Sequence, residues 1–174
     1  MPTSSAWLAI AAAVALLSAS GAEAQTRIVL TTKDFVAAAA QSDQFEIVEG
    51  RTALVQARDP RVRTFAQEMI QVHTGTSQDL QSAAMKAGVT MTPPGMNGDQ
   101  QKMLSALQSQ RGVDFDRTYL KQQVLAHQVA LVVEQAYATQ GADANVKQAA
   151  RAAVLVIKRH LAMAEQLRSA LARD

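Results

Sequence analysis

Hydrophobic residues recur every three or four positions along most of the chain, which is the spacing of an amphipathic helix and not of a strand. Five segments show this spacing, and helix start or stop signals bound them. They cover residues 31–57, 59–87, 99–110, 113–140 and 143–172. The pattern therefore predicts four long helices and one short one.

Residues at the segment ends support these boundaries. Thr31 or Thr32 can cap the first helix, and Asp143 can cap the last. Asp59 precedes Pro60, which suits the first position of a helix because its missing N–H has no intrahelical partner there. Residues 88–98 contain two prolines and three glycines, so they form a connection.

The connections predict how the helices pack. Only residues 58–59 separate the first two long helices, and a similarly short stretch around Gly141 separates the last two. Connections this short produce antiparallel helical hairpins, and two hairpins pack as a four-helix bundle. Aromatic residues make up only 4% of the 174 residues, while Ala, Gln and Leu abound. We expect an all-α, antiparallel four-helix bundle with the short helix between helices two and three.

All three histidines fall on the apolar stripes that such a bundle would bury. Counting in steps of three and four places His73, His127 and His160 each near the middle of a different long helix. The stripes are Val62, Ala66, Met69, His73, Thr76 and Leu80; Leu120, Val124, His127, Leu131, Glu134 and Ala138; and Val146, Ala150, Ala153, Ile157, His160, Ala164, Leu167 and Leu171.

The first long helix has a less decisive pattern. Phe35, Ala39, Ser42, Glu46, Glu49 and Ala53 form one possible stripe, whereas Phe45, Val48 and Val55 favour a face rotated by about one residue step. Glu46 lies near the middle of the helix in both cases.

Because neighbouring helices run antiparallel, Glu46, His73, His127 and His160 can meet in one layer. A buried polar group without a partner costs on the order of 1–3 kcal/mol, so these side chains must satisfy one another or bind a metal. Two interpretations stay open: a metal-binding layer of zinc, copper or iron, and a His/Glu hydrogen-bond network.

Several other polar and sulfur-bearing residues carry weaker expectations. We expect the two glutamates outside the central layer to be partly solvated and the two tyrosines to lie at the core edge. Gap filling is the commoner role for a methionine near a stripe, although copper or haem iron accepts thioether ligands. The residues are Glu49, Glu134, Tyr119, Tyr137, Met69 and Met163.

The first 24 residues are interpreted as a secretory signal peptide. Their apolar run is short and ends at "GAEA", in which Ala22 and Ala24 give the A-x-A cleavage pattern. No basic residue precedes the run, so an uncleaved membrane anchor stays the alternative. We expect a periplasmic protein with a single domain over residues 25–174 and no transmembrane segment after signal removal.

Charge and cysteine content exclude several functions. The net charge of +2 becomes 17 − 14 = +3 when Glu23 is removed with the signal, and Lys158-Arg159 is the only adjacent basic pair. Such scattered charge disfavours nucleic acid as a partner. With no cysteine, the chain cannot form disulfides, thiolate zinc sites or iron–sulfur clusters. A metal must therefore use His, carboxylate or Met ligands.

The chain resembles the exported bacterial family known as domain of unknown function 4142 (DUF4142), which is grouped with ferritin-like helical bundles. The resemblance rests on "DFVAAAAQSDQFEIVEGRTA", "DPRVRTFAQEMIQVHTGTSQDL", "FDRTYLKQQVLAHQ" and "VLVIKRHLAMAEQL", which span about residues 32 to 168. It implies an export signal, a ferritin-like bundle and equivalents of Glu46, His73, His127 and His160 in other members. It implies no reaction.

Ferritin chemistry is not expected here, because di-iron bundles use Glu-x-x-His and this chain lacks that motif. Three functions remain: a metal-binding bundle, a non-enzymatic structural or protein-interaction module of the envelope, and an enzyme with an open metal position. No Ser/His/Asp order or Gly-rich phosphate loop favours an enzyme. Non-covalent haem held by two histidines is a remote fourth. The pattern leaves the metal, substrate, partner and oligomeric state open.

Overall fold

The computed structural model describes residues 30–173, which form five helices and no strand. The all-α prediction is confirmed, and every expected helix boundary lies within two residues of the observed one. The predicted signal peptide lies outside the described residues. The helices are α2 (Thr32–Gln56), α3 (Pro60–Lys86), α4 (Gly98–Gln108), α5 (Gly112–Gln140) and α6 (Ala144–Leu171).

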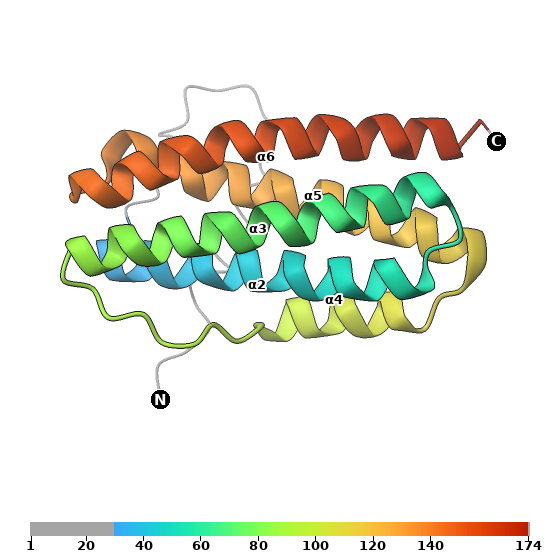
Figure 1. The fold of residues 1–174 in the computed structure, drawn as a ribbon, viewed down its shortest axis with the longest axis horizontal. Coiled ribbons are helices and arrows are strands. Elements are labelled where there is room, and N and C mark those ends of the chain that lie inside the picture. The colour runs from blue at the N-terminus through green and yellow to red at the C-terminus, as the bar shows by residue number, and fades with distance from the viewer. Residues whose placement is uncertain (1–29, 174) are drawn as a thin grey trace, which may run out of the picture.

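The four long helices lie side by side, and the short α4 lies along one flank (Figure 1). α2 packs against α3 and α5, while α6 packs against α5 and α3, so the long helices enclose a common interior. The colours in Figure 1 show that the chain reverses direction between α2 and α3 and again between α5 and α6.

Side chains expected to cap helices do so. Asp59 accepts a hydrogen bond from the N–H of Arg61, with Pro60 directly after the cap. Thr31, rather than Thr32, accepts from the N–H of Asp34. Asp143 caps α6, as predicted from the sequence.

The core consists of two apolar clusters at opposite ends of the bundle. One contains residues from the end of α2 and the starts of α3 and α5, such as Ala53, Phe65 and Tyr119. The other contains residues from the start of α2 and the end of α5, such as Phe35 and Tyr137, whose rings stack. On each long helix, a buried polar residue of the predicted stripe lies between the two clusters. These residues are Glu46 on α2, His73 on α3, His127 on α5 and His160 on α6.

Asp116 connects α5 to the turn between α2 and α3. Its carboxylate accepts hydrogen bonds from the backbone N–H groups of Arg58 at 3.0 Å and Asp59 at 2.8 Å. Asp116 is buried, so these bonds are shielded from competing water. They hold the α2–α3 hairpin at a defined height along α5, and therefore set which residues share a layer.

Replacing Asp116 with Ala should lower the free energy of unfolding by about 1–3 kcal/mol, because two N–H groups lose their acceptor. Asp114→Ala is the matched control: Asp114 is also in the first turn of α5 but is exposed, so its loss should cost less than about 1 kcal/mol. Urea unfolding followed by circular dichroism measures both values. Equal losses would show that the buried bonds contribute nothing beyond the helix dipole.

Candidate metal centre

The three histidines meet in the middle of the bundle, one each from α3, α5 and α6. Their ring centroids are 5.3–5.5 Å apart, and one nitrogen from each ring can be chosen so that all lie within 4.8 Å of one another. His73 is 4% exposed, His127 1% and His160 0%. The structure thus confirms that the stripes bring these imidazoles together in a buried layer.

His73 is oriented by a carboxylate on α2. Its Nδ1 lies 2.8 Å from Asp43 Oδ1, and the hydroxyl of Thr76 donates to the same oxygen at 2.9 Å. The opposite nitrogen, Nε2, is buried and has no hydrogen-bond partner within residues 30–173. Sequence reasoning missed Asp43, although its position three residues before Glu46 on a predicted helix was a signal that it shares that face.

His127 and His160 face each other. His127 Nδ1 lies 2.9 Å from the backbone oxygen of Gln123, which fixes this nitrogen as the donor. His127 Nε2 lies 3.4 Å from Nδ1 of His160. On its outer side, His160 Nε2 lies 3.4 Å from a guanidinium nitrogen of Arg159 and 3.9 Å from Oε1 of Glu68, the carboxylate that pairs with Arg159.

His73 and His127 each have one nitrogen directed at an oxygen acceptor, Asp43 for His73 and the Gln123 carbonyl for His127. Their other nitrogens are Nε2 of His73, which has no partner among the described residues, and Nε2 of His127, which faces Nδ1 of His160. The outer nitrogen of His160 lies beside Arg159 and Glu68. Metal-binding histidines in proteins almost always have the arrangement of His73 and His127, because the acceptor fixes the tautomer and the ring orientation.

Burial and neighbouring charges give the three imidazoles different proton affinities. Burial, with His73, His127 and Arg159 nearby, lowers the pKa of His160 to about 3. Burial also lowers the pKa of His127, against an opposing effect of Glu46. Burial alone would lower the pKa of His73, but its hydrogen bond to Asp43 and the charge of Glu46 raise it overall. Two of the three rings are thus held neutral at ordinary pH.

Glu46 lies beside the histidines on the far side of His127. Its Oε1 is 3.6 Å from His127 Nδ1, whereas the other nitrogen of that ring, Nε2, faces His160. Its Oε2 accepts a hydrogen bond from the side-chain amide of Gln123 at 2.6 Å. Glu46 and Ala53 are buried, whereas Val55 is 85% exposed. The buried face of α2 is therefore the stripe that contains Glu46, Glu49 and Ala53, and not the rotated face that contains Val55.

The expectation that Glu49 is partly solvated is wrong, because this side chain is fully buried next to Glu46. Gln123 donates to both carboxylates, at 3.1 Å for Glu49. Burial, and then the charge of Glu46, raises the pKa of Glu49 well above its usual range. A protonated Glu49 removes the charge repulsion that two adjacent buried carboxylates would otherwise have.

The core-edge expectation is also wrong for both tyrosines. Tyr119 is fully buried and Tyr137 is 2% exposed. The hydroxyl of Tyr137 donates to Thr32, whereas that of Tyr119 has no partner in the described part of the chain. Both rings fill the apolar clusters that close the polar layer from either end. Met69 is likewise buried in an apolar cluster and Met163 packs against it, which agrees with gap filling.

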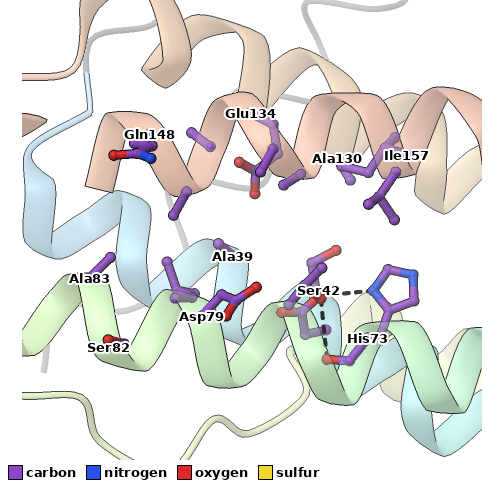
Figure 2. Close-up of a pocket in the computed structure, with 18 of the residues that line it drawn as sticks. Ala39, Ser42, His73, Asp79, Ser82, Ala83, Ala130, Glu134, Gln148 and Ile157 are labelled. Carbon is purple, nitrogen blue, oxygen red and sulfur yellow. Dashed lines mark hydrogen bonds and ion pairs between the residues drawn. The ribbon is translucent and has the colours of Figure 1, made fainter. Parts of the chain in front are cut away.

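Glu134 departs from expectation as well, because it is 7% exposed and not partly solvated. It follows His127 by seven residues on α5, which is two helical turns. Burial, with a smaller effect of Asp43, raises its pKa well above the usual range. Glu134 lines a cavity of about 340 Å³ between the long helices, shown with part of its lining in Figure 2.

The titration of His160 should make the metal-free protein lose stability as the pH falls from about 7.5 to about 5, while the raised pKa values of Glu49 and Glu134 act in the opposite direction. An unfolded histidine takes up a proton near pH 6.5, whereas folded His160 does so only near pH 3, so between these values the unfolded state binds more protons. In His160→Gln this loss should be smaller by about 1–2 kcal/mol. In His73→Gln the loss of stability should be larger than in the wild type. The raised pKa of His73 opposes the loss in the wild type, and the variant lacks this effect. Urea unfolding in the presence of a chelator measures the loss, and an equal loss in all three proteins would contradict the assignment.

None of the helices in residues 30–173 is both long and apolar enough to cross a membrane.

Solved structures with the same overall fold are helical-bundle proteins. CopM in its Cu(II)-bound form has a TM-score of 0.70 and 17% identity, with 82% of this chain and 98% of CopM covered. CopM in its Cu(I)-bound form gives 0.65 and 17%, with 79% and 95% covered. A DUF305 protein from Streptomyces coelicolor gives 0.69 and 14%, with 82% and 93% covered. At these identities the likeness establishes the fold alone.

No curated protein matches the chain. The family model described as "Domain of unknown function (DUF4142)" matches residues 17–167, which is most of the sequence. It includes the helices that carry all three histidines and Glu46. The match agrees with the resemblance seen in the sequence segments around those residues, and the chain belongs to the DUF4142 family.

Proposed function

We propose that this protein is an exported helical bundle that binds one transition-metal ion through His73, His127 and His160. The observation that carries the proposal is the convergence of three buried imidazoles, two of which, His73 and His127, have an oxygen acceptor at hydrogen-bond distance from one ring nitrogen. Glu46 acts as the carboxylate beside His127 rather than as a fourth ligand, because it approaches Nδ1 and not the Nε2 that faces His160.

The spacing of the nitrogens suits a metal ion. With metal–nitrogen bonds of about 2.0–2.1 Å and tetrahedral angles, two ligand nitrogens are about 3.3–3.4 Å apart. The distance from His127 Nε2 to His160 Nδ1 is 3.4 Å. One nitrogen of His73 completes a set whose members all lie within 4.8 Å of one another.

The electrostatics of the layer also support metal binding. Imidazole binds a metal only when neutral, and burial keeps His127 and His160 neutral by lowering the pKa of each. A metal ion would also give His73 Nε2 the partner that it lacks. A layer that served only as a hydrogen-bond network, as in a purely structural envelope module, would leave this buried nitrogen unpaired at a cost of about 1–3 kcal/mol.

Copper is the metal that we propose first. Three imidazoles bind zinc, copper or iron, and among the divalent first-row ions copper forms the strongest complexes with such ligands. Non-haem Fe(II) oxygenase sites use two histidines and one carboxylate, and here Glu46 lies behind a histidine. The similar CopM structures are described as Cu(II)-, Cu(I)- and Ag-bound forms, which supports copper for this shared bundle.

We also infer an antiparallel four-helix bundle of the ferritin-like kind over residues 25–174, delivered to the periplasm by a signal peptide over residues 1–24. The reversals of the chain between α2 and α3 and between α5 and α6 support the topology. The A-x-A pattern at Ala22 and Ala24 supports export.

Replacing any one of the three histidines with Gln should weaken Cu(II) binding by at least about a hundredfold, because one of three ligands is lost. Mutation of a residue that only hydrogen-bonds a metal ligand already lowers metal affinity by about 10–100-fold. Competition with a chromophoric chelator measures the dissociation constant, and elemental analysis of protein from its native envelope gives the metal bound in the cell.

Met69→Leu and Met163→Leu are the controls, since both keep the side-chain volume and remove a thioether. They should bind Cu(II) as the wild type does. Unchanged affinity in all three histidine variants would sink the proposal, and loss of affinity in a methionine variant alone would move the ligand set to sulfur.

Export predicts a defined mature end. When the full chain is produced in a Gram-negative bacterium, the periplasmic fraction should contain protein that begins at Gln25, after cleavage behind Ala24. Amino-terminal sequencing or intact mass measures it. Full-length protein in the membrane fraction would favour the uncleaved anchor instead.

A further inference from the structure

The cavity beside the histidine layer has no role in the proposed function. It measures about 340 Å³ and is lined by residues of α2, α3, α5 and α6. His73 and His127 line its inner part, while Asp79 and Gln148 lie at exposed positions on α3 and α6. Figure 2 shows these two residues on the facing helices α3 and α6. The cavity thus extends from the histidine layer to the surface.

Glu134 is the unexplained group in this cavity. Its carboxyl group projects from α5 into the space between the helices (Figure 2). Oε2 is buried and has no hydrogen-bond partner among the described residues. A carboxyl oxygen without a partner is costly to bury. Its position is best explained by a ligand that it meets only part of the time.

The charges around the cavity indicate which ligand this is. Four carboxyl side chains line it, those of Asp43, Glu46, Asp79 and Glu134, against the single ammonium group of Lys86. Asp79 is exposed, whereas Glu134 is buried about 10 Å along α5 from His127. Asp43 is in contact with His73 itself. Oxygen ligands therefore occur at successive depths from the surface to the imidazoles.

We propose that this cavity is the passage by which a metal cation reaches the histidine layer, and that Glu134 is an intermediate ligand on the way. The inference rests on the proposed metal binding. A passing cation exchanges part of its water for carboxylate oxygen at Glu134 and then for imidazole nitrogen at His73 and His127. The alanine side chains leave the space in which a partly hydrated ion moves.

Glu134→Gln is the informative variant. Burial favours the protonated form of Glu134 by raising its pKa, and Gln has nearly the same shape as that neutral acid. The fold is therefore retained, and only the ability to become a carboxylate is lost. A second variant, Ala153→Leu, fills part of the cavity from α6 without changing any charge.

The experiment measures Cu(II) association by stopped-flow absorbance and release into excess chelator. Both variants should load Cu(II) at least about tenfold more slowly than the wild type, within the range by which local charge changes association rates. Release should slow in parallel, so that the dissociation constant changes less than about threefold. A parallel change in both rates is the mark of a passage and not of a lost final ligand.

Matched controls lie on α6 outside the cavity, where Ala162 and Glu165 are both exposed. Ala162→Leu and Glu165→Gln should load at the wild-type rate. Glu68→Gln tests the other side of the layer, where Glu68 and Arg159 lie next to His160.

Wild-type loading rates in Glu134→Gln and Ala153→Leu, with affinity retained, would overturn the passage and leave the metal site standing. Slow loading in Glu68→Gln alone would overturn it too, by placing access beside His160. Absence of any Cu(II) binding by the wild type would overturn both the passage and the proposed function.

Discussion

The structure depends on keeping a layer of ionisable side chains in the middle of a bundle whose two ends are apolar. Three histidines and two glutamates lie between clusters in which Phe35 and Phe65 are almost completely buried. Each buried polar atom must find a partner or lower the stability of the fold by an amount that matters against a net stability of about 5–15 kcal/mol. The arrangement of the layer follows from this requirement.

Most of the partners come from a helix other than the one that carries the histidine. Asp43 on α2 reaches His73 on α3, and Glu68 on α3 approaches His160 on α6. Gln123 has two roles, since its backbone oxygen faces His127 while its amide donates to Glu46 and Glu49. The layer is therefore cross-connected, and it fixes the rotation of each helix about its own axis. The imidazole nitrogens that remain all point to one place.

The candidate site was predictable only in part. His73, His127 and His160 interrupt strongly apolar stripes, so their burial could be inferred from spacing alone. The solvation of Glu49 and Glu134 was predicted wrongly, because a glutamate on an apolar stripe is normally exposed to solvent. Here Gln123 accommodates one of them and the cavity the other. The sequence did not predict the roles of Asp43 and Glu68, because each contacts a histidine on another helix. Such a contact depends on how two helices are rotated relative to each other, and residue spacing along one helix gives no information about that rotation.

The sequence by itself determined the helices, their ends and the faces that they bury, because capping, proline geometry and apolar periodicity act between residues that are close in the chain. Only the tertiary structure decided which oxygen atoms face His73 and His127, the different pKa shifts of His73 and His160, and the cavity that reaches Glu134. These properties depend on distances of a few ångströms between different helices. Such distances are set by how the whole bundle packs, and no local pattern specifies them.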